Sequence, residues 1–463
     1  MAPVVIVGGG ISGLSTAFYL SQAGIPSVLI ERQPHLGGVI TTEVVDGCVI
    51  EGGPDSFLSA KPWAMDLIRE VGLESEVIGS NDHLRVTYVL RGGRLVPLPD
   101  GLMMMVPTRL WPMVTSGLLS WPAKFKMGLE LFRRPPAGPV GDRSVGDFVA
   151  DHYGTEAVDY LAEPLLAGVY GGSPWKLSVD SVLTRFTEIE RRYGSLSRGL
   201  LAAMRKAAHS SGTPLFRTLR GGLAQLTGAL EERIAGMTEV WRCDAARIER
   251  ASSGFRIRCG DEWLAATDVV LACQAYQAAS LVEGIDGELA NLLLTIPYSS
   301  SMTVALGYER ETFRHPLAGF GFLVPKVERK RLVACTWVGT KFDHRVSESR
   351  VMLRVFLGGA DDPEILDEPD EAILETVRGE LRSIMGVTET PSFARVSRWP
   401  RSMAQYTVGH ARRVEQVFGL LRRHPGLELA GNAYHGIGIP DCVRMGKEAA
   451  ERIARRRAES GNA

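Results

Sequence analysis

The sequence has no two cysteines close enough together to form a metal or redox motif. Its six cysteines are spread along 463 residues: Cys48, Cys243, Cys259, Cys273, Cys335 and Cys442. They form no C-x-x-C pair, and the nine histidines show neither i, i+4 spacing nor clusters with cysteine, which excludes the usual zinc-binding patterns. We expect free core thiols in a reducing compartment and no metal site in the protein.

A membrane-spanning segment and a secretory signal are also missing. No stretch reaches the roughly 18 uncharged apolar residues that a spanning helix needs. The first residues, MAPVVIVGGGISG, lack the basic start and the small-residue cleavage site of a signal peptide. We expect a cytoplasmic protein, and any contact with the cell membrane would be peripheral and on its inner face.

Neither charge sign is in excess. The chain carries 52 basic and 53 acidic residues, and 45% of its residues are hydrophobic, which is typical of a folded protein rather than a disordered or nucleic-acid-coating one. We therefore expect no nucleic-acid partner. The length exceeds what one hydrophobic core usually serves, so two or three domains are expected.

The first forty residues predict a βαβ unit that binds a dinucleotide. Residues 4–7 are an apolar run of the kind buried on both faces of a parallel sheet, and residues 8–13, GGGISG, follow directly. In a G-x-G-x-x-G turn the first glycine makes the bend, the second admits a phosphate and the third lets helix and strand pack closely. A helix ending at Gly24 and a strand over residues 27–30 come next, and Glu31 is placed to bind a ribose hydroxyl.

A second glycine pair, Gly37 and Gly38, follows Glu31 within the residues ERQPHLGG. Such a pair lets another backbone segment approach a long, deeply buried dinucleotide, which favours FAD over NAD. This run resembles the FAD motif of the amine oxidase-like flavoproteins.

The middle of the chain changes from loop and hairpin patterns to helical ones. Residues 51–58, EGGPDSFL, have the composition of a loop, and residues 84–98 predict a hairpin that turns at residues 91–93. From residue 101 to about residue 208 the pattern is mainly helical. Helices are expected at about 107–132, 144–166 and 195–208.

The start of this helical stretch is unusually apolar, with basic residues close behind it. The apolar residues are Met103, Met104, Met105, Val106, Leu110, Trp111, Met113, Val114, Leu118, Leu119 and Trp121, and the basic ones are Lys124, Lys126, Arg133 and Arg134. The combination suits a surface that lies in a membrane interface. A buried helical core with solvated lysines and arginines accounts for it equally well.

The second half of the chain alternates between two sheet patterns. A glycine turn opens an amphipathic helix over residues 219–234, and residues 266–272 form a buried strand of the same type as the first one, so the dinucleotide sheet is expected to resume there. From about 285 to 395, strand-like runs and one helix near 370–385 predict a separate mixed sheet. A short strand at 427–429, a glycine-rich loop and a long helix follow.

Six motifs occur in the order GGGISG, ERQPHLGG, GGPDSFL, GVYGG, GFGFLVP and GNAYHGIGIPDC. Together they resemble the protoporphyrinogen and coproporphyrinogen oxidase family of haem biosynthesis over essentially the whole chain. The resemblance implies an α/β plus α+β fold with three domains. They are a Rossmann-like FAD-binding domain of discontinuous segments (1–83, 210–284 and 396–463), a mixed-sheet substrate-binding domain (84–100 and 285–395) and a helical domain that docks on membranes (101–209).

The resemblance also assigns residues to noncovalently bound FAD, including a loop beside the flavin at the start of the last helix. They are Gly8, Gly9, Gly10, Ile11, Ser12, Gly13, Glu31, Arg32, Gly37, Gly38, Val39, Gly53, Pro54, Asp55, Ser56, Ala245, Trp399, Ile437, Gly438 and Ile439. The family usually has valine beside the adenine where this chain has Ala245, so a backbone contact is expected at that position.

For the substrate, Arg85 matches a family arginine that pairs with a propionate, a contact that the guanidinium fork suits. Gly168 matches a glycine whose backbone faces the tetrapyrrole, and Phe320, Leu323 and Phe356 match positions that clamp its rings. Each of these could instead be an ordinary surface or core residue. Some relatives have arginine where Asp55 and Ala167 stand, so no substrate-carboxylate contact is carried over to those two positions.

The implied reaction is a six-electron oxidation of a porphyrinogen to a porphyrin in three two-electron steps. Flavin N5, rather than a catalytic side chain, would accept hydride, and dioxygen would be the acceptor. The substrate is coproporphyrinogen III or protoporphyrinogen IX, and GPDSFL and the ACTW run at 334–337 look more like the coproporphyrinogen branch. A membrane surface and the next enzyme of the haem pathway are further expected partners.

Other functions stay open at this stage. An amine or polyamine oxidase would share the fold and would line its flavin with an aromatic pair, and a carotenoid desaturase is a second related enzyme. A flavin-bearing scaffold without turnover would keep the glycine motifs but would need no carboxylate-binding arginine.

Overall fold

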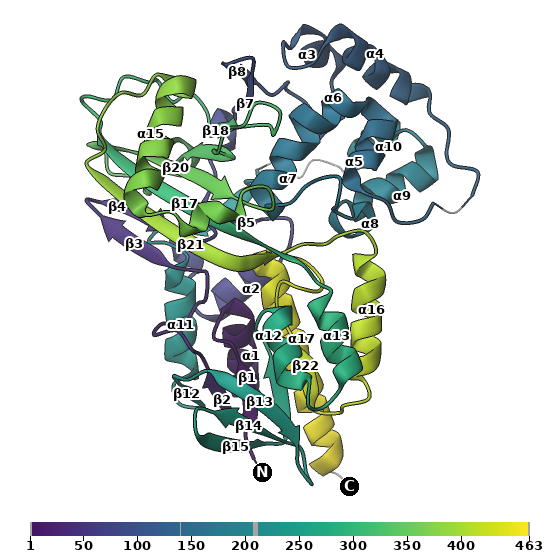
Figure 1. The fold of residues 1–463 in the computed structure, drawn as a ribbon, viewed down its shortest axis with the longest axis vertical. Helices are drawn as coiled ribbons and strands as arrows, with labels where there is room; N and C mark the ends of the chain where they lie inside the picture. Colours follow the sequence, from purple (N-terminus) through teal and green to yellow (C-terminus); the bar gives the residue numbers. More distant parts are fainter. Residues whose placement is uncertain (1, 139, 207–211, 462–463) are drawn as a thin grey trace.

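A computed structural model gives the fold and describes residues 2–138, 140–206 and 212–461. Figure 1 shows a lower region with a parallel sheet and both ends of the chain, an upper region built on a second sheet, and a group of helices beside that second sheet. Within the described ranges, no helix is long and apolar enough to cross a membrane. Those ranges also contain no group of three or more His, Cys, Asp or Glu residues that could hold a metal ion.

The lower region is centred on a five-stranded parallel sheet whose strands come from distant parts of the chain. In spatial order they are β12 (Thr238–Trp241), β2 (Ser27–Ile30), β1 (Val4–Val7), β16 (Asp268–Leu271) and β22 (Leu427–Leu429). All four pairings are parallel, and the three central strands are buried along their whole length. Continuous apolar runs of this kind are needed where helices cover both faces of a sheet.

Helices cover this sheet, and the closest packing joins the first helix to the last one. They are α1 (Ile11–Gln22), α2 (Trp63–Glu70), α11 (Ala224–Ile234), α12 (Ala275–Val282), α13 (Gly287–Leu294), α16 (His410–Leu421) and α17 (Ile439–Gly461). The Thr16 hydroxyl donates to the Gly446 carbonyl at 3.2 Å, and a Cβ on Gly446 would overlap the Ser12 carbonyl oxygen. The glycine at position 446 therefore lets α17 lie directly against α1.

The upper region contains a seven-stranded mixed sheet. Its order is β21 (Phe393–Ala404), β17 (Tyr298–Glu309), β20 (Arg350–Gly358), β19 (Ala334–Trp337), β18 (Gly321–Leu323), β7 (Thr87–Arg91) and β8 (Arg94–Pro97). Only the β18–β7 pair is parallel. One face packs on α15 (Asp370–Met385) through alternate residues such as Val351, Leu353 and Val355. Arg354 and Phe356, which alternate with these residues along β20, therefore point to the opposite face.

The helical group is a separate buried cluster of short elements. They are α3 (Leu110–Thr115), α4 (Trp121–Leu129), the 3₁₀ turn η3 (Glu130–Phe132), α5 (Val145–Tyr153), α6 (Thr155–Ala157), the π-helical turn η4 (Val158–Ala162), α7 (Glu163–Tyr170), α8 (Val179–Val182), α9 (Thr184–Tyr193) and α10 (Leu196–Lys206). The predicted helix 195–208 corresponds to α10, and its last two residues lie outside the described residues, as does the predicted domain limit at 209–210.

Smaller antiparallel sheets and turns connect these regions. They are β13 (Ala245–Arg250) with β14 (Phe255–Cys259) and β15 (Glu262–Ala266), β5 (Phe57–Leu58) with β11 (Phe216–Leu219) and β6 (Val77–Gly79), β3 (Thr42–Val45) with β4 (Cys48–Glu51), and β9 (Leu102–Met103) with β10 (Val106–Pro107). The short helix α14 (Val338–Lys341) and the 3₁₀ turns η1 (Glu74–Glu76), η2 (Asp82–Leu84) and η5 (Pro363–Asp367) complete the described elements.

The structure corrects the expectation that all cysteines are free. Cys243 and Cys259 form a disulfide with a Cα–Cα distance of 5.9 Å, whereas Cys48, Cys273, Cys335 and Cys442 are free thiols. The pairing of β13 with β14 places Ala245 opposite Cys259 and so brings Cys243, two residues earlier, within bonding distance. A separation of 16 residues gives no sequence motif for such a contact.

Burial divides the apolar stretch after residue 101 into a buried part and an exposed part. Met105, Val106, Met113, Leu118 and Leu119 are buried in the helical cluster. Met103, Met104, Leu110, Trp111, Val114 and Trp121 are exposed, together with Phe125, Leu129 and Phe132, which had not been singled out. The stretch is thus a helical core with an apolar outer face.

Candidate functional site

The glycine turn after β1 has the conformation that a dinucleotide fingerprint requires. Gly8 has a φ of +106°, and a Cβ on Gly13 would overlap the Gly8 carbonyl oxygen, so both positions need glycine. Gly10 differs, because a Cβ built on it would meet no described atom within 4 Å. The space on this side of the Gly10 backbone fits a group that approaches from outside the chain.

The first turn of α1 supplies the donors for that group. The helix begins at Ile11 with Gly10 as its N-cap and with no side-chain cap among the described residues, and Ile11, Ser12 and Gly13 are buried. The first N–H groups of a helix have no partner within the helix, and they carry the positive end of its dipole. An anionic pyrophosphate fits this end of α1.

The carboxyl end of β2 lies beside the glycine turn. Glu31 is buried, and its two carboxylate oxygens accept from the backbone N–H of Gly9 at 2.7 Å and of Gln33 at 2.8 Å. The Glu31 N–H donates to the carbonyl of Trp241 at 3.0 Å, which brings the segment leading to Ala245 next to it. Arg32 follows with an exposed side chain. Gly9, Glu31 and the segment between Trp241 and Ala245 therefore lie together at the carboxyl end of the parallel sheet.

The second glycine pair packs on the first. The Gly37 N–H donates to the Gly9 carbonyl at 2.8 Å, and a Cβ on Gly38 would lie 3.1 Å from the Gly10 Cα. A Cβ on Gly53 would in turn overlap the carbonyl oxygen of Val39, whose side chain is 39% exposed. Three separate segments within the first 53 residues thus form one continuous path that starts at the N-terminus of α1.

The loop from Gly52 to Ser56 is held against the face of the seven-stranded sheet that points away from α15. The Gly52 carbonyl accepts from Trp399 Nε1 at 2.7 Å and from the Thr303 hydroxyl at 2.8 Å. The Gly53 carbonyl accepts from Arg354 Nη2. Trp399 was predicted to contact the cofactor, and the structure places it behind the loop that carries Gly53, Pro54, Asp55 and Ser56.

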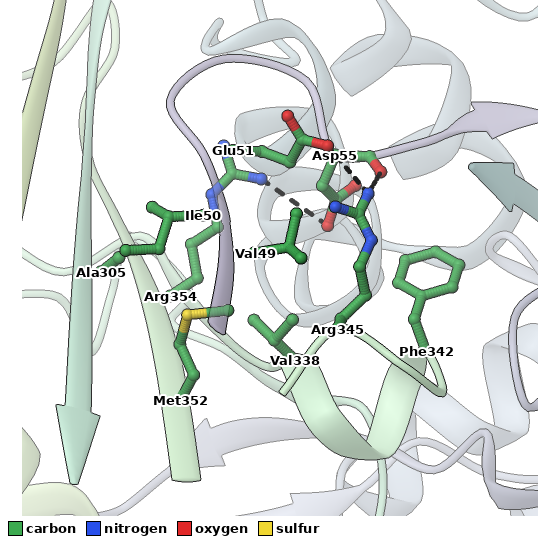
Figure 2. A pocket seen from close by; sticks show the side chains of 10 residues that line it. All are labelled: Val49, Ile50, Glu51, Asp55, Ala305, Val338, Phe342, Arg345, Met352 and Arg354. Atoms are coloured by element: carbon green, nitrogen blue, oxygen red, sulfur yellow. Dashed lines mark hydrogen bonds and ion pairs between the residues drawn. The ribbon is translucent and has the colours of Figure 1, made fainter. Parts of the chain in front are cut away.

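A cluster of buried charges next to this loop was not predicted. Arg345 Nη2 donates to Glu51 at 2.8 Å, and Lys341 Nζ lies 2.9 Å from Asp55. Figure 2 shows the charged ends of Glu51, Asp55, Arg345 and Arg354 at one end of a cavity with room for about one water molecule, with apolar residues such as Val338 around the rest. Burial alone would raise the pKa of Asp55, but Lys341 and Arg354 outweigh it and hold that pKa below its usual range.

The loop before α17 meets the site from the C-terminal end of the chain. The Gly436 N–H donates to the hydroxyl of Tyr406 at 2.8 Å, and that hydroxyl donates to the Asn432 carbonyl at 2.8 Å. Ile437 and Gly438 are half-buried, and Ile439 begins the helix. Gly446, near the start of α17, packs on Ser12 and Thr16 near the start of α1, so the N-terminus of α17 lies on the same side of the molecule as the glycine turn.

The residues predicted to face the substrate lie on or near β18 and β20. Cross-strand pairing through Ala334 puts Leu323 and Phe356 on one face of the sheet, and Gly168 on α7 approaches Leu323, with 3.9 Å between a built Cβ and Cδ2. Phe320 is buried before β18, and its N–H donates to the Val86 carbonyl at 2.8 Å. Arg85 is exposed just before β7, and the Val86 backbone next to it contacts Phe320.

Comparison with known proteins identifies the family. The family model described as "Flavin containing amine oxidoreductase" matches residues 11–454. The chain belongs to the flavin-containing amine oxidoreductases.

Three proteins with porphyrinogen oxidase names are similar to this chain over most of its length. Coproporphyrinogen III oxidase of Bacillus subtilis (strain 168) is 33% identical over 96% of both chains. Protoporphyrinogen oxidase 1 of Spinacia oleracea chloroplasts is 28% identical over 97% of this chain and 83% of its own. A crystal structure from Exiguobacterium sp. 255-15, provisionally named a protoporphyrinogen oxidase, has a TM-score of 0.89 and 31% identity over 98% of this chain and 99% of its own.

The cofactor of this flavin-containing amine oxidoreductase is FAD. The open side of Gly10 and the uncapped start of α1 suit the pyrophosphate of a dinucleotide, which FMN lacks. When bound, FAD supplies the two-electron oxidation chemistry that amino-acid side chains cannot. The chain's own residues supply the cradle and orient the reactants.

The charged residues around the 52–56 loop were missed because they form no recognisable motif in the sequence. Lys341, Arg345 and Arg354 come from three different positions in the second half of the chain and share no motif. One signal was available, since Arg354 lies in the middle of the apolar strand RVMLRVFLG. A charge in such a strand is rarely buried unless it is paired.

Proposed function

We propose that this chain is an FAD-dependent oxidase that converts a porphyrinogen to a porphyrin in haem biosynthesis. The observation that carries the proposal is the 33% identity to a coproporphyrinogen III oxidase over 96% of both chains. The site supports it, because the path of glycines reaches a broad sheet face lined by Leu323 and Phe356.

The reaction removes six electrons and six protons from the macrocycle, and three molecules of dioxygen take them up as hydrogen peroxide. The chain contributes binding and orientation rather than a strong base, because three hydrides leave meso carbons and the three protons, two from N–H groups and one from a meso carbon, become acidic as the ring is oxidised. Phe320, Leu323 and Phe356 would hold the ring plane, and the backbone at Gly168 would allow its close approach.

The three regions in Figure 1 correspond, in this proposal, to three tasks. Residues 1–83, 210–284 and 396–463 bind FAD, residues 84–100 and 285–395 bind the substrate, and residues 101–209 dock on a membrane. The proposal is supported by the sheets, because β7 and β8 join the strands from the 285–395 segment whereas β1, β16 and β22 join one another.

Steady-state oxidation of both porphyrinogens, followed by porphyrin fluorescence, tests the proposed function. We expect turnover of coproporphyrinogen III to exceed that of protoporphyrinogen IX, because coproporphyrinogen III oxidases are among the relatives at 30% identity or more. Anaerobic mixing with a porphyrinogen should bleach the flavin. Bleaching by an amine or by a carotenoid precursor instead would assign one of the related activities, and no bleaching by any of them would leave only a scaffold.

Arg85→Ala should raise KM for both porphyrinogens with less effect on kcat. Loss of a charge-assisted contact with a propionate corresponds to ~1.5 to 3 kcal/mol, or roughly 10- to 150-fold in KM. Arg85→Lys should recover only part of the loss, because the bidentate fork is missing. Arg94→Ala, an exposed arginine on the same hairpin, is the matched control. Unchanged KM values in Arg85→Ala would remove Arg85 from the site.

Membrane docking should depend on the exposed apolar face of α3, α4 and η3. Trp111 is 74% exposed and Phe132 is 80% exposed, and Phe125 lies between them on α4. Basic residues border this face, although Lys124 Nζ already donates to the carbonyl of Ser116 at 2.6 Å. Aromatic residues beside cations are typical of helices that lie in the headgroup region.

Flotation with anionic phosphatidylglycerol vesicles measures this docking. The variant with Trp111, Phe125 and Phe132 changed to serine should lose most of its flotation, and Trp263→Ser, which alters an exposed tryptophan on β15, should not. Leu118 is unsuitable for this test because it is buried. Equal flotation of the triple variant and the unmodified protein would show that another surface, or none, meets the membrane.

A further inference from the structure

The peptide of Gly53 is held from two sides by parts of the chain that are far apart in sequence. On one side it lies so close to Val39 that a Cβ on Gly53 would overlap the Val39 carbonyl oxygen. On the other side its carbonyl oxygen accepts a hydrogen bond from Arg354 Nη2. Val39 belongs to the glycine path that begins at α1, whereas Arg354 belongs to β20, an inner strand of the seven-stranded sheet.

Arg354 also contacts the carboxylate at the next bend of the same loop. Its Nη1 lies 3.6 Å from Asp55 Oδ2, and only 4% of its side chain is exposed. Asp55 has a second partner in Lys341, whose Nζ lies 2.9 and 3.2 Å from the two carboxylate oxygens. Loss of Arg354 would therefore leave the Asp55 charge compensated, but the Gly53 carbonyl would lose its described donor.

The other side of Arg354 touches the face proposed to bind the substrate. Its guanidinium carbon lies 4.9 Å from the centre of the Phe356 ring, and both side chains project from β20 on the face opposite α15. A guanidinium at this distance from an aromatic ring is attracted to it. One side chain thus contacts the Gly53 carbonyl, the Asp55 carboxylate and the ring of Phe356.

We propose that Arg354 is a positioning residue that fixes the Gly53–Ser56 loop relative to Phe356, and so sets the distance between the cofactor and the substrate ring. The proposal rests on the proposed function, because Phe356 has a substrate to orient only if a porphyrinogen binds. Its effect on the loop concerns the cofactor alone and can be measured without any substrate.

The test compares three variants of the FAD-bound enzyme. Arg354→Met keeps an unbranched apolar stem and removes the donors, and Arg354→Lys keeps one charge. Arg395→Met removes an arginine of the same sheet whose partner, Glu43 at 2.9 Å, lies on the surface. The readouts are the visible spectrum of the bound flavin, the FAD dissociation constant after dialysis, and kcat and KM with coproporphyrinogen III.

Arg354→Met should alter the flavin spectrum, weaken FAD binding by about tenfold and lower kcat more than it raises KM, since a charge-assisted contact is lost. In Arg354→Lys these changes should be smaller than in Arg354→Met, because an ammonium reaches Gly53 or Asp55 but does not span both. Arg395→Met should match the unmodified enzyme. If Arg354→Met does not fold, Arg354→Lys and Asp55→Asn decide by the same readouts.

A folded Arg354→Met enzyme with the unmodified spectrum, FAD affinity and kcat overturns the proposal. If Arg354→Lys and Asp55→Asn both keep the flavin spectrum and FAD affinity of the unmodified enzyme, the proposal is also overturned. If the unmodified enzyme oxidises neither porphyrinogen, the proposed function fails, while the spectrum and the FAD dissociation constant still test the role of Arg354 in the loop.

Discussion

Gly10→Ala is expected to yield a folded protein that no longer retains FAD. The Gly10 backbone, with a φ of −71°, is one that alanine adopts readily, and a Cβ there meets no described atom within 4 Å. The methyl group would instead occupy the space through which a phosphate reaches the first turn of α1. We expect at least about a hundredfold loss of affinity, because several phosphate contacts are lost together.

The ratio of flavin to protein after purification, together with a thermal melt, measures this effect. Acid precipitation of the unmodified protein should release FAD into the supernatant, and FMN there or flavin left on the pellet would contradict the assignment of noncovalent FAD. Gly228→Ala, also a glycine with open space around its Cβ but on α11, is the control and should keep its flavin. Full flavin content in Gly10→Ala would mean that the phosphate lies elsewhere.

His152→Ala should destabilise the helical group by about 3–5 kcal/mol, because it leaves a cavity in a buried cluster and removes a hydrogen-bond partner of two buried carboxylates. The imidazole is buried between two carboxylates, with Nδ1 3.1 Å from Glu130 and Nε2 3.0 Å from Glu190. These residues come from α5, η3 and α9, and the Ser195 hydroxyl before α10 also donates to Glu130 at 2.9 Å. A single side chain therefore joins three elements.

Acid should weaken the same network. Burial raises the pKa of Glu130, but hydrogen bonds from His152, Leu196 N–H and Ser195 outweigh it, so the folded-state pKa is lowered. A lowered carboxyl pKa contributes stability above the unfolded value of about 4.3 and loses it as pH falls through the folded value.

Urea unfolding of the helical group, monitored by hydrogen exchange at pH 7 and below pH 4, measures the effect of His152→Ala and the effect of acid. The unmodified protein should lose this stability in acid, and Glu130→Gln should start lower and change less with pH. Arg191→Ala, which breaks an exposed pair with Asp180, should cost at most about 1 kcal/mol. If His152→Ala lowered the free energy of unfolding by no more than Arg191→Ala, the network would contribute little to stability.

The sequence predicts the parts of the fold that depend on local pattern. Residues 4–7 and 27–30 are strands, as their apolar runs predict, and the helix near 370–385 runs over Asp370–Met385. Glycine positions carry the same kind of information, because a positive φ or a close approach is a property of one residue. That is why the turn at residues 8–13 and the pair at Gly37 and Gly38 could be identified before any contact was known.

Features that depend on register or packing could not be predicted in this way. The burial of Leu118 beside the exposed Trp111 follows from how α3 and α4 lie on the helical core, and helices this short show little periodicity. The helices α8 and α9 were not predicted, although the residues TRFTEIERRY of α9 are amphipathic. The contact of Arg354 with Gly53 joins residues 301 positions apart, and a single sequence gives no sign of such pairs.

The order of strands in the parallel sheet affects when its first and last helices can pack together in the cell. β1 and α1 are made first, but β16 and β22 come from residues 268–271 and 427–429, and α17 follows. At roughly 5–20 residues per second, tens of seconds of translation separate β1 from β22. Throughout that interval the surface of α1 that Gly446 will cover stays exposed, so the packing of α17 on α1 can form only after nearly the whole chain has been made.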